Sequence, residues 1–119
     1  MEDEVNFSPD RKYALYFFPI EMKMSHWVNR PRLVNAISGK VLLNLSNSLW
    51  HADEITWSED GESVVLELRR YPGDVPGVSL DVNLTGKTAR LLIGETKDII
   101  NTDEVLNRLE MYYQTQHRF

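Results

Sequence analysis

Two histidines in this chain stand beside residues that could support chemistry. His51 lies two positions before Asp53, and a histidine with a carboxylate can hold a metal ion or move a proton. Metal sites need three or four convergent ligands, however, and the third histidine, His117, is far from both in the sequence. We therefore expect His51 to be a surface residue near a loop.

The other histidine, His26, precedes Trp27 in a basic segment that contains Arg30 and Arg32. An indole ring flanked by guanidinium groups could stack on a base or sugar, or anchor a protein partner. The alternative is a core position for Trp27, because a small sheet needs large side chains to seal its ends. We favour the core position.

Carboxylates are concentrated between His51 and Ser63, where five acidic residues occur without a base. A glycosidase-type pair is not favoured, because Asp53 and Glu54 point to opposite faces of a regular strand. The pair Glu59–Asp60 precedes Gly61, as is typical of a turn. This segment could dock a basic partner. Alternatively, these residues are solvated loops, or they neutralise the basic segment 22–39.

A third candidate is the pair Arg69–Arg70 with Tyr71, at the base of a loop that contains two prolines and two glycines. Arginine and tyrosine are enriched among residues that dominate protein–protein binding. The alternative is a long hairpin connection whose prolines block edge pairing. Trp50, just before the acidic segment, would be an anchor for the same partner.

The sequence lacks the residues that several kinds of catalysis and cofactor binding require. The chain has no cysteine, which excludes disulfides, thiol catalysis and Cys-ligated metals. Ser38-Gly39-Lys40 resembles the end of a phosphate-binding loop, but Val34 stands where the leading glycine belongs and Val41 where serine or threonine belongs. We find no dinucleotide-binding, nucleophile-elbow or zinc-protease motif, and we expect no cofactor, no metal and no catalysis.

The composition fits one domain of 119 residues, with 42% hydrophobic and 26% charged residues. The net charge of −5 disfavours binding to nucleic acid or an anionic membrane. The acidic start, Met1-Glu2-Asp3-Glu4, does not resemble a secretory signal, and no apolar run is long enough to span a bilayer. We expect a cytoplasmic protein.

The elements that must position these residues are mostly strands. Apolar residues alternate in 55–57 and 63–70 around a turn at Gly61, which predicts a hairpin. A second hairpin is predicted for 78–84 and 88–93, so that 50–93 becomes a four-strand antiparallel meander. Further strands are predicted at 12–18 and 41–45.

The remaining segments are predicted as follows. Residues 1–11 are expected to be a loose arm, and 21–39 either an irregular connection or a short helix over 31–37. A C-terminal helix should start at Asn101 or Thr102, which can cap it. Its apolar stripe, which includes Val105 and Leu109, should pack on the sheet. Arg108, Glu110 and Gln114 are expected to face water.

These observations predict an α+β, mainly β domain: an antiparallel meander sheet of about five or six strands with a C-terminal helix packed on it. The leading functional hypothesis is a small acidic protein-binding module, in particular an immunity- or antitoxin-like inhibitor of a basic toxin or enzyme. One alternative is a small β-barrel that binds a ligand or performs simple acid/base chemistry with His26, Trp27, Arg30 and Arg32 or with His51 and Asp53. Another is an assembly subunit, which could form a homodimer. The predicted partner-binding residues are Asp53, Glu54, Glu59, Asp60, Glu62, Trp50, Arg69, Arg70 and Tyr71.

Overall fold

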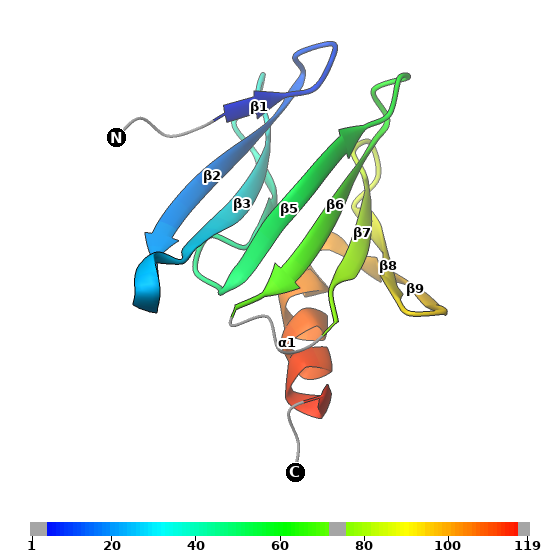
Figure 1. Cartoon of the computed structure of the whole chain (residues 1–119). Helices are drawn as coiled ribbons and strands as arrows, with labels where there is room; N and C mark the ends of the chain where they lie inside the picture. The colour runs from blue at the N-terminus through cyan, green and yellow to red at the C-terminus, as the bar shows by residue number, and fades with distance from the viewer. Residues whose placement is uncertain (1–4, 72–75, 117–119) are drawn as a thin grey trace.

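Two antiparallel sheets and one C-terminal helix make up the computed structural model, which describes residues 5–71 and 76–116 (Figure 1). The first sheet contains β1 (Val5–Phe7), β2 (Tyr13–Glu21), β3 (Trp27–Asn35) and β4 (Val41–Asn44), in that spatial order. The second contains β5 (Trp50–Trp57), β6 (Ser63–Arg70), β7 (Val78–Asn83), β8 (Thr88–Ile93) and β9 (Thr96–Asn101). Short 3-10 turns, η1 (Lys23–Ser25) and η2 (Thr102–Glu104), precede β3 and the helix α1 (Val105–Gln116).

The predicted fold class is confirmed, and so is the meander from β5 to β8, but the described chain has nine strands in two sheets. The strand that the sequence did not predict in the second sheet is β9, because Thr96-Lys97-Asp98 shows no apolar alternation. It follows β8 through a two-residue turn in which Gly94 has φ +60°. Glycine adopts this left-handed conformation without steric cost.

Residues 27–35 form a strand, so the predicted helix over 31–37 is wrong, as is an irregular connection through this part of 21–39. Pro31 is compatible with β3 because the hydrogen-bonded ladder between β3 and β4 ends beside it. The Pro31 carbonyl accepts a hydrogen bond from Leu45 N–H (2.9 Å), just past the end of β4. The pairing of β3 with β4 ends at Arg32–Asn44, so Pro31 lies at the end of that ladder and its nitrogen, which cannot donate, leaves no ladder bond unmade.

The N-terminal segment is also more ordered than predicted. Val5–Phe7 pairs with β2 as an edge strand, and residues 1–4 lie outside the described part. Asn6 accepts a hydrogen bond from the indole N–H of Trp57 (2.7 Å). This contact ties the edge of the first sheet to the second sheet, so residues 5–7 are not a loose arm.

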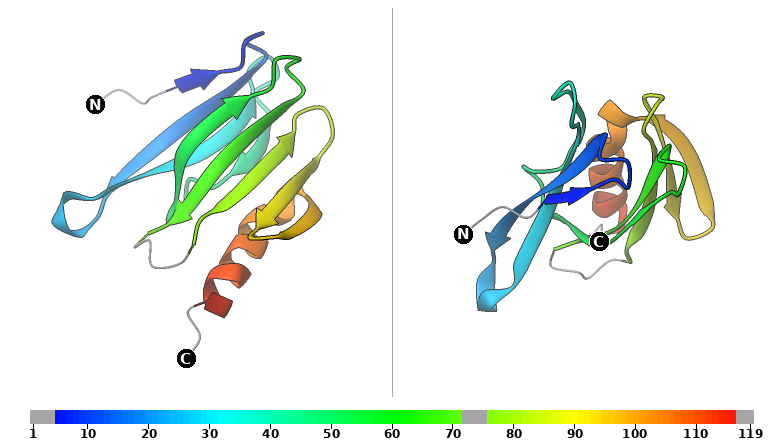
Figure 2. Two further views of the ribbon diagram at one scale, coloured as in Figure 1. Left: turned by 45° about the vertical axis from the view of Figure 1, so that its right-hand side comes forward. Right: turned by 90° about the horizontal axis from the view of Figure 1, so that it is seen from above.

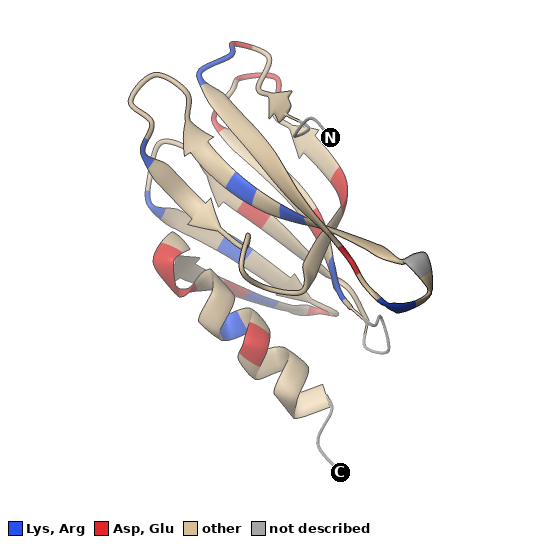
Figure 3. Ribbon diagram, turned by 90° about the vertical axis from the view of Figure 1, so that its left-hand side faces the viewer, with Lys and Arg blue, Asp and Glu red and all other residues tan. Residues whose placement is uncertain are grey.

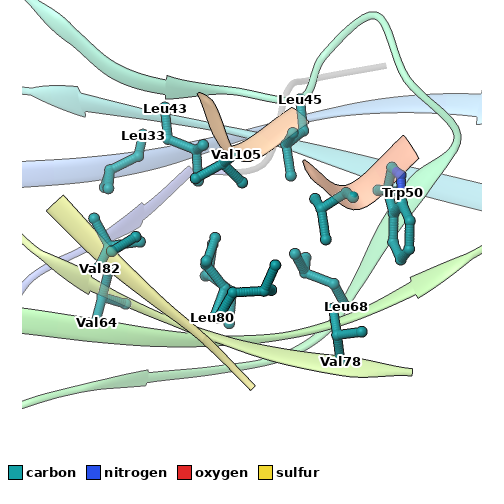
Figure 4. Packing of buried hydrophobic residues seen from close by; sticks show 14 of the residues in the cluster. Leu33, Leu43, Leu45, Trp50, Val64, Leu68, Val78, Leu80, Val82 and Val105 are labelled. Carbon is teal, nitrogen blue, oxygen red and sulfur yellow. The ribbon is translucent and has the colours of Figure 1, made fainter. Parts of the chain in front are cut away.

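One hydrophobic core fills the space between the sheets (Figure 4). Leu15 and Leu33 enter it from the first sheet, Leu66 and Leu80 from the second. The helix lies between the two sheets when the molecule is seen from above (Figure 2). Its residues Val105 and Leu109 are fully buried in the same cluster, as the apolar stripe predicted.

The helix differs from prediction in two respects. Asn101 stands at the N-cap position of η2, but its side chain makes no capping hydrogen bond. Arg108 and Glu110, which were expected to face water, are 38% and 34% exposed and also form ion pairs. Arg108 binds Asp98 of β9 (2.7 Å) and Glu110 binds Arg70 of β6 (3.0 Å).

Candidate acidic face and the neighbouring pocket

The five predicted acidic residues are all exposed, but they form two groups on the β5–β6 hairpin. Asp53 and Glu54 lie within β5, whereas Glu59, Asp60 and Glu62 occupy the turn after it. Three residues of extended strand, or about 10 Å, separate Glu54 from the end of β5. The acidic segment is therefore a strip along one hairpin.

A β-bulge changes the expected direction of Asp53. The pairing of β5 with β6 shifts between Ala52 and Glu54, so the strand is not regular there. Glu54 pairs with Glu67, whose carboxylate accepts a hydrogen bond from Ser79 (2.5 Å) on the outer face. Asp53 contacts Arg69 (2.9 Å). The bulge thus lets both adjacent carboxylates occupy the outer face, where a regular strand would separate them.

The turn residues border a shallow hollow of about 290 Å³ on the outer face of the second sheet. Asp60 and Glu62 lie at one side of the hollow, and Asp81 of β7 contributes a third carboxylate. Arg90 of β8, directly opposite Asp81 in the strand register, is the one basic residue among those that line it. Ser79, Asp81 and Asn83 alternate with apolar residues along the chain, but nothing in the sequence connects them with the acidic turn.

Local hydrogen bonds hold the Asp60 carboxylate in place and extend its ionisation to lower pH. The Ser58 hydroxyl donates to its carboxylate (2.6 Å), and the Glu62 N–H donates to the same oxygen (3.0 Å). These bonds hold the pKa of Asp60 below its ordinary value. The negative charge of the turn is therefore fixed by the turn itself.

Two of the predicted partner-binding residues contact the helix. Trp50 is fully buried, and its indole N–H donates to Glu110 (2.8 Å). Arg70 donates to Glu110 from Nε (3.0 Å) and Nη2 (3.2 Å), and its Nη1 binds the Tyr71 carbonyl (2.9 Å). The Trp50 side chain is not available as a surface anchor, so that prediction is wrong. Arg70 is half-buried, with 15% of its side chain exposed, and its part in partner binding stays a prediction.

Glu110 is the residue that sequence reasoning missed here. Burial alone would raise its pKa, but the hydrogen bonds from Arg70 and Trp50 outweigh that effect and keep the pKa below its ordinary value. No motif could have identified it, since its partners lie 40 and 60 residues away.

The residues of the ligand-binding hypothesis meet in part. A pocket of about 250 Å³ lies where the start of β3 meets the ends of the β5–β6 hairpin. Its lining includes His26, Trp27, His51, Arg69 and Tyr71, and the rings of His26 and Tyr71 are 6.3 Å apart. Trp27 is 48% exposed, so its predicted core position is wrong.

Arg30 and Arg32 lie outside the lining of that pocket. Arg30 donates to the Phe18 carbonyl (2.9 Å), and the Arg32 guanidinium lies over the Phe18 ring at 4.5 Å from its centroid. Within the described residues, no direct ion pair joins Arg30 or Arg32 to the acidic strip. Figure 3 shows acidic and basic residues interspersed over the face that it presents.

His51 is held on both ring nitrogens. Its Nδ1 accepts a hydrogen bond from Asn29 N–H (2.9 Å), and its Nε2 lies 3.2 Å from the Asp53 carboxylate. Burial lowers the pKa of His51; Asp53 raises it and Arg69 lowers it, and the net direction is downward. The imidazole therefore bridges the two sheets.

Within 5–71 and 76–116, no three His, Asp or Glu residues are grouped as a metal ion would require. No helix in this part is long and apolar enough to cross a membrane. His117 and residues 72–75 of the predicted interface loop lie outside the described residues.

Comparison with protein-family models, with curated proteins and with solved structures finds no match for this chain.

Proposed function

We propose that this protein is a small binding module that docks a cationic partner protein on the acidic outer face of its second sheet. The observation that carries the proposal is the hollow that Asp60, Glu62 and Asp81 border with a single arginine. Carboxylates held on a rigid sheet attract a basic surface over several ångströms and accelerate encounter.

Within this class we propose an immunity- or antitoxin-like inhibitor of a basic toxin or enzyme. Two properties support that role. The chain lacks the usual catalytic motifs, and an acidic face can cover a basic active surface or mimic its anionic substrate. Arg69 and the half-buried Tyr71 lie at the other end of β6 and would extend the contact beyond the acidic strip.

The test uses charge reversal in the turn. The tagged protein is incubated with extract of its source cells, and retained proteins are released by a salt gradient and identified. Glu59→Lys with Glu62→Lys should abolish retention of one basic protein. Glu21→Lys with Glu95→Lys is the matched control, because both double variants change the net charge from −5 to −1 and all four residues are exposed. The control should retain the partner.

Two outcomes would contradict the proposal. One is a partner that both double variants retain equally at high salt, since the acidic face would then be irrelevant. The other concerns the inhibitor role: the captured protein should arrest growth when expressed alone, and co-expression of this chain should relieve the arrest. A captured protein without toxicity leaves the binding face supported and removes the inhibitor assignment.

A further inference from the structure

A third concave site lies between the two sheets, at the end of the strands opposite the His26–Tyr71 pocket. It is a cleft of about 540 Å³, larger than either hollow described above and within the range of small-molecule sites. Tyr13 and Asn35 pair at the first sheet's end of the cleft, and the β7–β8 connection forms the other wall. The residues at the start of β4 and at the junction of β9 with η2 complete it.

The floor of the cleft is apolar. Leu84 is 4% exposed and belongs to the core, while Tyr13 and Leu42 are half-buried and pack against the core. Val41, at the rim, is 47% exposed. An apolar floor that continues the core but stays open to solvent is suited to an apolar chain or ring.

The polar groups around the cleft favour an anion. Lys40 comes from the first sheet and Lys87 from the second, and neither ammonium group forms an ion pair within the described residues. Their backbones are fixed, because the Lys40 carbonyl accepts from Asn35 N–H (2.8 Å) and the Lys87 carbonyl accepts from Thr102 N–H (3.0 Å). Asp103 is the one carboxylate of the lining, which leaves one positive charge in excess.

We propose that this cleft binds a small amphiphilic anion, whose apolar part lies on Leu42 and Leu84 and whose anionic group lies between Lys40 and Lys87. Asn101 can add a hydrogen bond, since its side chain makes no capping bond to the helix start. Thr85 lines both this cleft and the outer hollow, so the β7–β8 connection separates the two sites.

Three probes with the same eight-carbon alkyl group test the proposal: octanoate, octan-1-ol and octylammonium. Each is titrated into the ¹⁵N-labelled full-length protein, and the amide resonances of the protein are followed. Octanoate should shift the amides of 84–87, 41–42 and 101–103 saturably, and more tightly than the other two. Each methylene group removed from the carboxylate series should weaken binding by about fourfold.

Variants define the contribution of each part. Lys40→Gln and Lys87→Gln should each weaken octanoate binding by about two- to fivefold, with Lys97→Gln, outside the cleft, as the control. Val41→Asn should weaken all three probes, whereas Ile37→Asn, which is exposed and outside the lining, should not. The same spectra report whether each variant is folded.

The proposal is overturned if octanol or octylammonium binds as tightly as octanoate, if the shifts map elsewhere, or if octanoate causes no saturable shift. Its failure is distinguishable from failure of the proposed docking function. Glu59→Lys with Glu62→Lys should leave octanoate binding unchanged, and the lysine variants should leave partner capture unchanged.

Discussion

Glu110 joins three elements through one carboxylate. Trp50 is the first residue of β5, Arg70 is the last residue of β6, and the two are directly paired in the sheet register. Both donate to the Glu110 side chain, which comes from α1. Arg70 also stacks on Tyr113 of the helix, with its guanidinium carbon 3.9 Å from the ring centroid. The open end of one hairpin is thereby fixed to the helix.

We predict that Glu110→Ala destabilises the protein by about 1.5–3 kcal/mol, because it leaves two largely desolvated donors without an acceptor. Glu110→Gln should cost about 1 kcal/mol, since its amide oxygen can still accept from Trp50. Urea unfolding followed by tryptophan fluorescence measures both values. Glu104→Ala, at an exposed position near the helix start, should change stability by less than about 1 kcal/mol. Equal losses at positions 104 and 110 would contradict the role of this carboxylate.

His51 makes stability depend on pH. Its Nδ1 can accept from Asn29 only when unprotonated, and its pKa in the folded protein is below the ordinary value of 6.5. The unfolded chain therefore takes up this proton more readily than the folded protein. The free energy of unfolding should fall as the pH drops below 6.5, and this contribution should level off below the pKa of the folded protein.

The measurement is urea unfolding at intervals from pH 7.5 down to pH 5, which starts above the ordinary pKa of 6.5 and follows the predicted fall in stability below it. His51→Gln keeps an acceptor for Asn29 and cannot titrate, so its stability should change less over the same range. A wild-type protein and a Gln variant with parallel pH curves would show that His51 does not bind its proton differently in the two states.

For single residues, the sequence indicated which side chains are exposed but not which side chains they contact. The acidic residues 53–62 were correctly expected to be exposed, because charged side chains in and beside a turn remain solvated. Trp50 and Arg70 were assigned to the surface, since nothing local indicates that Glu110 receives them. A contact between residues 40 or more positions apart follows from the fold alone.

At the scale of elements, the β5–β6 turn contacts the loop between β1 and β2. Gly61 has φ +74°, and a Cβ at this position would lie 2.7 Å from Oδ2 of Asp10. Asp10 is itself held by the Ser8 hydroxyl (2.7 Å) and by Lys12 N–H (3.1 Å). The turn that carries the acidic strip is therefore packed against the first sheet.

We predict that Gly61→Ala destabilises the protein more than Gly94→Ala. Both substitutions place a side chain at positive φ, which costs about 1–2 kcal/mol. Only at position 61 must Asp10 also move, because nothing lies within 4 Å of a Cβ at position 94. Thermal unfolding of the two variants gives the comparison, and equal losses would show that the Asp10 contact carries no energy.

Periodicity found the strands that alternate and missed those that do not. Strands β5 to β8 were predicted because one face is apolar and the other polar. Strand β3 was missed because Pro31 argues against a strand unless its nitrogen lies where no ladder bond is needed. The sequence does not show that the pairing of β3 with β4 ends beside Pro31. The helix stripe was predicted, but Glu110 lies at its edge and faces the hairpin.

The whole molecule has one core, to which both sheets and the helix contribute. Leu33 belongs to the first sheet and Leu80 to the second, and both are fully buried in this cluster. Leu33→Ala and Leu80→Ala should each cost about 2–5 kcal/mol, while Ile37→Ala, at a side chain 77% exposed, should cost little.

Because the core is shared, each leucine variant should lower the midpoint of one common unfolding transition. Two of the three tryptophans, Trp50 and Trp57, belong to the second sheet, and the third, Trp27, is 48% exposed. Tryptophan fluorescence is therefore weighted toward the second sheet, whereas far-ultraviolet circular dichroism reports the strands of both sheets. The two signals should coincide in urea for wild type and both variants, as expected for two-state unfolding. If Leu33→Ala instead separated them, with circular dichroism lost before fluorescence, the first sheet would unfold independently. The contacts of His51 and Trp57 across the two sheets would then contribute little to cooperativity.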